Sequence, residues 1–253
     1  MLGGRCSAVG GRGSGLDYNR ADLPEFPVTS IRRATPSTRI VRLKLGSTPF
    51  PYVAGQAALL GLPGREPAAY SIASAPEESL RERYLEFLIK LESGATWGAH
   101  LAGLTRGVGV DVDGPLGSFT FPAKPAADVF LFVAGGTGIA PLRSMIRHAI
   151  LSGQRERLRL LYSARTPADF AYLPELRGLA RLGQLELSLT ATREVPAGWR
   201  GHHGRITPPR LAPLVDTPDT LCFVCGPASM VHDVPVMLTG LGIDRARIRV
   251  EEW

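Results

Sequence analysis

The sequence predicts a β plus α/β fold class, in which an antiparallel β-barrel domain is followed by an α/β domain with a parallel sheet. Between residues 27 and 121, short β-rich runs are separated by frequent turn residues, which is typical of a small antiparallel barrel. From residue 128 onward, apolar strand-like runs alternate with segments of helical periodicity, which indicates a parallel sheet with helices on both faces. A chain of 253 residues is long enough for two such domains.

The barrel half is expected to contain short strands and one helix. The expected strands are residues 28–33, 38–45, 56–62, 69–73, 84–91, 108–112 and 118–121. Gly114, Pro115 and Gly117 are typical turn residues, so we expect a turn between the last two strands. The expected helix covers residues 96–104.

The α/β half is expected to alternate strands and helices. The expected strands are 129–133, 158–162, 185–189, 221–224 and 247–250, and the expected helices are 139–151, 169–182, 208–214 and 227–241. A Pro/Ala-rich stretch, 122–127, is expected to separate a barrel domain over 25–124 from an α/β domain over 125–253. Residues 1–24 are rich in Gly, Arg and Ser and lack periodicity, which is typical of a flexible tail.

One stretch, DVFLFVAGGTGIAPLRSMIRHAIL, begins the α/β half. Its apolar run 129–133 predicts a buried strand, three glycines follow, and apolar residues then recur at helical spacing. Glycines allow a close approach to a ligand, and a helix N-terminus favours an anion, so the loop suits a nucleotide pyrophosphate. A plain strand-to-helix turn is the alternative. The dinucleotide motif G-x-G-x-x-G is not met, because Pro141 stands in place of its third glycine.

Composition restricts the class of protein. The net charge is +6, spread along the chain without a basic–aromatic patch, so a nucleic-acid partner is not expected. No apolar stretch is long enough for a membrane span, and no secretory signal is evident. Cys6, Cys222 and Cys225 are too few for a disulfide framework or an iron–sulfur cluster. We expect a soluble cytoplasmic protein without a metal site.

The loop Gly136-Thr137-Gly138-Ile139-Ala140-Pro141 resembles that of the ferredoxin–NADP reductase superfamily, in its bacterial type without an iron–sulfur domain. The resemblance extends over residues 26–253. It implies a flavin-binding barrel followed by a nicotinamide-nucleotide domain, with FAD and NADP(H) as cofactors.

Four segments of the barrel half carry the same resemblance. The first segment is Tyr70-Ser71-Ile72-Ala73-Ser74. In the family, the tyrosine of this segment packs on the isoalloxazine ring and the serine lies near flavin N5, which implies flavin contacts for these five residues. The second implies that the strand with Leu88, Ile89 and Lys90 lines the phosphate side of the flavin. The third implies that Gly94, Ala95 and Thr96 hold the pyrophosphate. The fourth is the turn GPLGSF at residues 114–119.

Ala68 departs from this pattern. The family has an arginine there, two residues before the tyrosine, and it pairs with the flavin pyrophosphate. Arg65 is out of register, and Lys90 is a possible substitute. Ala68 therefore leaves open whether FAD binding is weakened or FMN is preferred; we expect FAD.

Two strand ends of the α/β half bear on nucleotide choice. Arg165 follows the second strand, where NAD-specific folds tend to place an acid. Thr192-Arg193 is similar to the segment that holds the adenosine 2′-phosphate in ferredoxin–NADP reductases, with Arg200 and Arg205 downstream. We expect the protein to bind NADPH in preference to NADH. The alternative is that these arginines only form an exposed basic loop.

The last two strands end in further family-like segments. Cys225-Gly226-Pro227 matches a motif whose thiol lies beside the nicotinamide, although Cys222 leaves a metal or redox pair open. The chain ends Glu251-Glu252-Trp253, similar to the family's Glu-x-aromatic group, in which the ring stacks on the flavin. A surface tryptophan is the alternative. His202 and His203 are expected in a solvated loop.

The resemblance implies a flavin-dependent NAD(P)H oxidoreductase. Hydride passes from NADPH to FAD, and electrons then pass to a protein acceptor such as ferredoxin, flavodoxin or an oxygenase component. The implied catalytic residues are Ser71, Cys225, Glu251 and Trp253. Two alternatives remain: a non-enzymatic or weakly flavin-binding electron-transfer subunit, which Ala68 favours, and a reductase that releases free reduced flavin.

Overall fold

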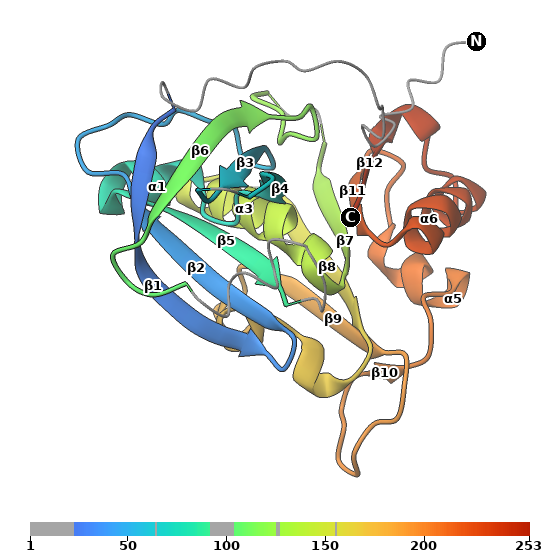
Figure 1. The fold of residues 1–253 in the computed structure, drawn as a ribbon. Helices are drawn as coiled ribbons and strands as arrows, with labels where there is room; N and C mark the ends of the chain where they lie inside the picture. Colours follow the sequence, from blue (N-terminus) through green and yellow to red (C-terminus); the bar gives the residue numbers. More distant parts are fainter. Residues whose placement is uncertain (1–22, 64, 92–103, 125–126, 155) are drawn as a thin grey trace, which may run out of the picture.

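The structure, a computed structural model, describes residues 23–63, 65–91, 104–124, 127–154 and 156–253. Its strands form two six-stranded sheets (Figure 1). The first sheet is antiparallel, with strand order β4-β3-β6-β1-β2-β5. The second is parallel, with order β10-β9-β8-β7-β11-β12. The predicted fold class is confirmed.

The antiparallel sheet curves into a barrel. Its strands are β1 (Glu25–Thr35), β2 (Thr38–Lys44), β3 (Ala57–Gly61), β4 (Ala68–Ser71), β5 (Tyr84–Lys90) and β6 (Gly109–Leu116). A single bridge between Ile72 and Phe87 joins its two edges, just beyond the end of β4. Alternate residues fill the barrel, because successive side chains of a strand point to opposite faces. Phe87 and Ile89 therefore pack in the barrel core, whereas Leu88 packs in the core of the second domain.

The parallel sheet is covered on both faces. Its strands are β7 (Val129–Gly135), β8 (Arg157–Ala164), β9 (Glu186–Ala191), β10 (His202–His203), β11 (Leu221–Gly226) and β12 (Ile248–Glu252). Its helices are α3 (Ile139–Leu151), α4 (Leu173–Arg181), α5 (Pro208–Leu211) and α6 (Ala228–Gly240). The first two pack with Phe130 and Phe132 on one face, and the last two with Leu131 and Val133 on the other. Every residue of β7 is buried.

Several boundaries differ from those expected. Residues 118–121 are not a strand, because Phe119 and Phe121 leave the barrel to pack against Phe223 and Phe130 of the parallel sheet. Gly114 and Pro115 lie inside β6 rather than in a turn. The helix expected over 169–182 begins only at Leu173, and 167–169 form a 3₁₀ turn. His202 and His203 pair with β9 as a short edge strand. The helix expected over 96–104 lies almost wholly outside the described residues.

One helix was not expected, α1 (Pro76–Glu82). Its sequence carries the usual start signals, since Pro76 opens it and acidic residues fill the first turn. The Glu78 carboxylate accepts a hydrogen bond of 2.9 Å from the Ala75 backbone N–H. The helix is short, so these signals lack the apolar periodicity that marks a longer helix.

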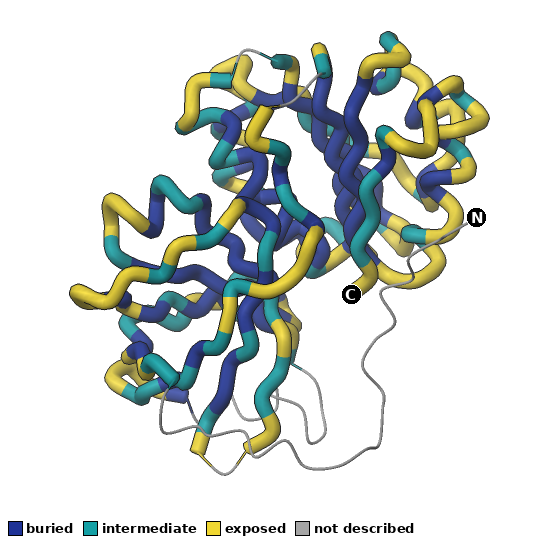
Figure 2. Tube along the Cα trace, turned by 90° about the horizontal axis from the view of Figure 1, so that it is seen from above, coloured by how far each residue is buried: buried dark blue, intermediate teal, exposed yellow. Residues whose placement is uncertain are grey.

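Apolar side chains join the two domains. Ile40, Ala73 and Leu88 of the barrel belong to the same buried cluster as Phe132 and Ile146 of the α/β domain. Figure 2 shows that buried residues run through the centre of each domain, whereas exposed residues lie mostly in the outer loops. The interface between the domains is therefore part of the hydrophobic core.

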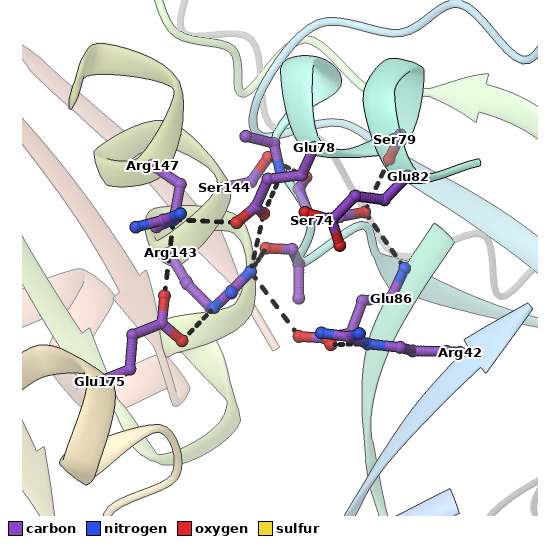
Figure 3. A network of polar contacts seen from close by, with 12 residues as sticks. Arg42, Ser74, Glu78, Ser79, Glu82, Glu86, Arg143, Ser144, Arg147 and Glu175 are labelled. Carbon is purple, nitrogen blue, oxygen red and sulfur yellow. Dashed lines mark hydrogen bonds and ion pairs between the residues drawn. The ribbon is translucent and has the colours of Figure 1, made fainter. Parts of the chain in front are cut away.

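Charged side chains cross the same interface (Figure 3). Arg143 of α3 is 4% exposed. Its guanidinium lies 3.3 Å from the Glu78 carboxylate, 3.6 Å from that of Glu86 and 2.9 Å from that of Glu175. Burial alone would lower the pKa of Arg143, but these carboxylates outweigh it and raise the pKa. Arg147, one turn later, pairs with Glu78 at 2.9 Å. Arg42 pairs with Glu86 at 2.6 Å.

We predict that Glu78→Gln lowers the free energy of unfolding by about 3 kcal/mol at neutral pH, because it leaves Arg143 short of a buried countercharge. Burial raises the pKa of Glu78, but Arg143 and Arg147 outweigh it, so this pKa is lowered below 4.5. The stabilisation is therefore fully present above pH 4.5 and is lost as the pH falls through the folded-state pKa. Urea unfolding of both proteins across this range measures the difference.

Glu82→Gln is the matched control, because Glu82 lies in the same helix and pairs only with the exposed Arg81 in the described contacts. Its effect should stay within about 0.5 kcal/mol. Equal losses in the two variants would show that the buried network is not what holds the interface.

Candidate functional site

A cavity of about 620 Å³ lies between the two domains. Its barrel wall is formed by the turn between β1 and β2 and by the end of β5. Its other wall is formed by the loops that follow β7, β8, β9 and β11, with part of α6. These loops lie at the carboxyl edge of the parallel sheet, where open α/β sheets bind ligands. The volume is in the range of small-molecule sites.

The glycine loop is part of this cavity. Gly136 and Thr137 line it, and Gly136 has a φ of +56° with open space where a side chain would stand. The Tyr162 hydroxyl donates a hydrogen bond of 2.9 Å to the Gly136 carbonyl and holds the loop. Gly138 has another role, because a Cβ there would lie 2.3 Å from the carbonyl oxygen of Cys225. One glycine therefore faces the cavity, and another permits close packing of two loops.

Cationic and hydroxyl side chains line the cavity. Lys90 approaches from the barrel, and Arg165, Arg193 and Arg205 from the α/β domain. The Arg193 backbone N–H donates to the Arg165 carbonyl at 2.8 Å, so the ends of β8 and β9 are held side by side. The hydroxyl residues of the lining are Thr35, Ser37, Thr38, Thr137, Ser163, Thr166, Thr192 and Ser229. Such a donor set is suited to phosphate groups.

Cys225, Glu251 and Trp253 meet at the ends of β11 and β12. Cys225 is fully buried and lies opposite Glu251 in the strand register. The Trp253 indole N–H donates to the Glu251 carboxylate at 2.6 Å, and the Trp253 backbone N–H donates to the carbonyl of Gly226 at 3.1 Å. Trp253 lines the cavity together with Pro227. The structure thus brings these predicted residues together.

Burial sets the protonation of two of these groups. It raises the pKa of Cys225, and the neighbouring Glu251 raises it further. Burial also raises the pKa of Glu251 to about 7, although the hydrogen bond from Trp253 opposes this shift. The Cys225 thiol stays protonated at neutral pH and is not a nucleophile.

The metal or redox pair of Cys222 and Cys225, which the sequence left open, is contradicted by the structure. The two cysteines are three positions apart along β11, an odd number, so their side chains lie on opposite faces of the sheet. Cys222 packs in the cluster beneath α5 and α6, and Cys225 in the cluster beneath α3 and α4. His202 and His203 are both exposed.

The barrel segment 70–74 does not line the cavity. Tyr70 is half-buried, and the four residues after it are buried. The Ser74 hydroxyl accepts from the Glu86 backbone N–H at 3.1 Å, and its carbonyl accepts from the Tyr52 hydroxyl at 2.8 Å. Ser74 therefore has a structural role, and Ile89 likewise packs inside the barrel rather than at the cavity. Gly94, Ala95 and Thr96 lie outside the described residues.

Sequence reasoning missed the turn at residues 35–38. Its residues line the cavity, and Thr35 and Thr38 share a hydrogen bond of 2.7 Å between their hydroxyls. The Leu91 backbone N–H donates to the Ser37 carbonyl at 2.7 Å and ties the turn to the end of β5. Three hydroxyl residues around Pro36 were the available signal, but such residues are common in any turn.

Two family models match the chain. Residues 25–121 match the oxidoreductase FAD-binding domain, and residues 132–235 match the oxidoreductase NAD-binding domain. The boundary expected between residues 124 and 125 lies between the two matches and stays a prediction. No helix in the described part of the chain is long and apolar enough to cross a membrane.

Curated relatives include ferredoxin–NADP reductase B of Sorangium cellulosum, which is 33% identical over 92% of this chain and 99% of that protein. The reductase component of propane 2-monooxygenase from Mycolicibacterium smegmatis is 33% identical over 80% of this chain but only 60% of its own length. The chain thus spans less than two thirds of that relative.

Solved structures share the fold. A ferredoxin NADP⁺ reductase from Neisseria gonorrhoeae with bound FAD and NADP aligns with a TM-score of 0.78 at 21% identity, over 91% of this chain and 98% of that chain. The ferredoxin reductase in carbazole 1,9a-dioxygenase aligns with a TM-score of 0.77 at 25% identity, over 91% of this chain and 69% of that chain. Together with the two matched domains and the reductase from Sorangium, these findings show that the chain belongs to the ferredoxin–NADP reductase family of FAD- and NAD(P)H-dependent oxidoreductases.

Proposed function

We propose that this protein is an NADPH-dependent reductase that uses FAD to pass electrons to a protein acceptor. The observation that carries the proposal is that both domains contribute to one cavity, with the glycine loop and four cationic side chains in its lining. NADPH and FAD together bear several phosphate groups, and a cavity lined by Lys90 and three arginines suits them.

The described residues fit a flavin nucleotide. Gly136 leaves open space at the cavity wall, and Lys90 and the 35–38 turn offer donors on the barrel side. Lys90 lines the cavity and Arg65 does not, which supports Lys90 as the substitute for the arginine that Ala68 replaces. We assign Leu88 and Lys90 to the flavin because they line the cavity. We also assign Tyr70 and Ser71 to it, although they do not line the cavity, because they match the flavin segment of the family. Bound FAD supplies the chemistry, since it accepts a hydride and gives up single electrons.

The nicotinamide end of NADPH is assigned to Cys225, Gly226 and Pro227. Cys225 shapes this end as a neutral thiol, consistent with its burial. Trp253 lines the cavity with 42% of its surface exposed, so its ring is free to be displaced when the nicotinamide binds. Its hydrogen bond to Glu251 sets the position from which it moves.

The adenosine end is assigned to Arg165, Thr192 and Arg193, with Arg205 added by its place in the cavity. Asp169 also lines this end, and NAD-specific folds use an acid to bind the ribose hydroxyls. The Asp169 carboxylate instead accepts from the backbone N–H and the hydroxyl of Thr166, at 3.1 and 2.8 Å. Three arginines against this carboxylate leave the adenosine end with an excess of positive charge, which favours the 2′-phosphate of NADPH.

An acidic electron carrier fits as the acceptor, because the net charge of this chain is +6. The relatives' names include ferredoxin–NADP reductase and oxygenase reductase components, so a ferredoxin, a flavodoxin or an oxygenase component is the acceptor class we propose. Purified protein that is yellow and bleaches on anaerobic addition of NADPH would support the assignment. Protein that is colourless, and that remains colourless after incubation with FAD and removal of the unbound FAD, would favour the non-enzymatic subunit instead.

We predict that NADPH reduces the flavin at lower concentration than NADH, and that Arg193→Ala narrows this preference about tenfold or more. A charge-assisted hydrogen bond to the 2′-phosphate contributes about 1.5–3 kcal/mol, which sets the size of the loss. Anaerobic titrations that follow flavin absorbance measure both nucleotides. Arg200→Ala is the control, because Arg200 does not line the cavity. An unchanged ratio in Arg193→Ala would remove Arg193 from the site.

We also predict that the stability of the protein depends on pH through Glu251, whose pKa is raised to about 7. The folded-state pKa of Glu251 is raised above its ordinary 4.5, so its contribution to stability is greatest below pH 4.5 and is lost as the pH rises through about 7. Melting temperatures from pH 4.5 to 8 should fall more steeply in the wild-type protein than in Glu251→Gln. Parallel curves for the two proteins would refute a raised pKa at this carboxyl.

A further inference from the structure

Helix α3 contacts both halves of the site. Its N-terminus follows the glycine loop directly, and its second turn reaches the barrel. There the Arg143 guanidinium donates to the carbonyl of Ala73 at 2.7 Å, and the Ser144 hydroxyl donates to the carbonyl of Ser74 at 2.7 Å. All of these residues are buried. Two adjacent side chains of the nucleotide-loop helix thus hold two adjacent carbonyls of the segment that follows Tyr70 and Ser71.

Arg143 is itself fixed on several sides, as Figure 3 shows. Its Nε donates to Glu175 of α4 at 2.9 Å, its Nη1 faces Glu78 of α1 at 3.3 Å, and its guanidinium lies 4.8 Å from the ring centre of Tyr172. A planar guanidinium meets carboxylates and a carbonyl in different directions at once, which a lysine ammonium on a flexible stem does not reproduce. The contact with Ala73 is therefore held in one geometry.

In the described part of the chain, the backbone-to-backbone hydrogen bonds of segment 70–74 all go to other parts of the barrel. The Ile72 backbone N–H donates to Gln56 at 2.9 Å, and the Ala73 backbone N–H donates to Glu86 at 2.7 Å. The apolar contact of Ala73 joins the segment to the α/β domain without direction, and the bonds from Arg143 and Ser144 are the hydrogen bonds that fix its position there. Hydride transfer needs the two reacting atoms in near contact, and a misplacement of about 1 Å costs about a hundredfold in rate.

We propose that Arg143 and Ser144 are positioning residues: they fix the flavin-facing segment 70–74 relative to the nucleotide loop and so set the distance for hydride transfer. The proposal rests on the proposed function, in which flavin lies against Tyr70 and Ser71. Neither Arg143 nor Ser144 lines the cavity. Their effect is on geometry rather than on the affinity for NADPH.

Two variants test the proposal, Arg143→Lys, which keeps the charge, and Ser144→Ala, which removes one hydrogen bond. Arg147→Met is the control, because Arg147 lies on the same helix and shares Glu78 and Glu175 with Arg143, but in the described contacts it donates no hydrogen bond to segment 70–74. The first measurement is amide hydrogen exchange of residues 70–75 in the protein without added flavin. The second is the rate constant of flavin reduction at saturating NADPH, with the concentration for half-saturation.

We expect exchange in residues 70–75 to be about tenfold faster in both variants, and flavin reduction about tenfold slower with half-saturation unchanged. Arg147→Met should leave both values at those of the wild type. Wild-type exchange in both variants, wild-type reduction rates in both, or equal losses in Arg147→Met would overturn the proposal. If Arg143→Lys does not fold, Ser144→Ala decides alone. Failure of the wild type to reduce flavin would instead refute the proposed function, and the exchange measurement would still test the contact.

Discussion

A buried arginine between two domains is the constraint on which the rest of this structure depends. Arg143 can remain charged there only because carboxylates from α1, β5 and α4 converge on it. Around it, Arg42, Arg143 and Arg147 pair with Glu78, Glu86 and Glu175, and the more exposed Arg32 lies 3.8 Å from Glu86. Because ions lose most of their hydration on burial, such a network adds little stability compared with apolar packing. It does penalise any other arrangement of the domains, since a shifted interface would leave a buried charge unpaired.

The fixed interface determines which groups face each other across the cavity. Lys90 at the end of β5 and the 35–38 turn lie opposite the loops of Arg165 and Arg193. Neither wall alone offers an enclosed site, since each is an open strand end or turn. Apolar packing of Leu88 and Phe121 against the α/β domain brings the walls together, and the charge network selects the register in which they meet. The cationic lining of the cavity is thus a property of the interface.

Sequence patterns predicted most of the fold and part of the site, for identifiable reasons. The run 129–133 and the helix 139–151 were found because their periodicities are long and local, and α3 has the expected bounds. Residues 118–121 were wrongly predicted as a strand because β-forming aromatics also suit a domain interface. The role of Arg143 was invisible, because an arginine within an amphipathic helix is typical of a solvated position and its partners lie 32 to 70 residues away in the chain. The 35–38 turn was missed because hydroxyl residues around a proline are common in any turn.

The glycine loop shows how one motif satisfies two demands. Gly136 faces open space at the cavity, as expected for a position that a nucleotide approaches. Gly226, by contrast, leaves no such space, because a Cβ placed on it would lie 3.1 Å from the Cα and 3.2 Å from the backbone nitrogen of Gly135. A Cβ on Gly138 would lie even closer to the carbonyl of Cys225. The loops after β7 and β11 therefore pack backbone against backbone. Cys225 and the start of α3 are joined in this way, and α3 is joined through Arg143 to the barrel, so a continuous chain of close contacts connects the barrel segment with the loop beside Cys225.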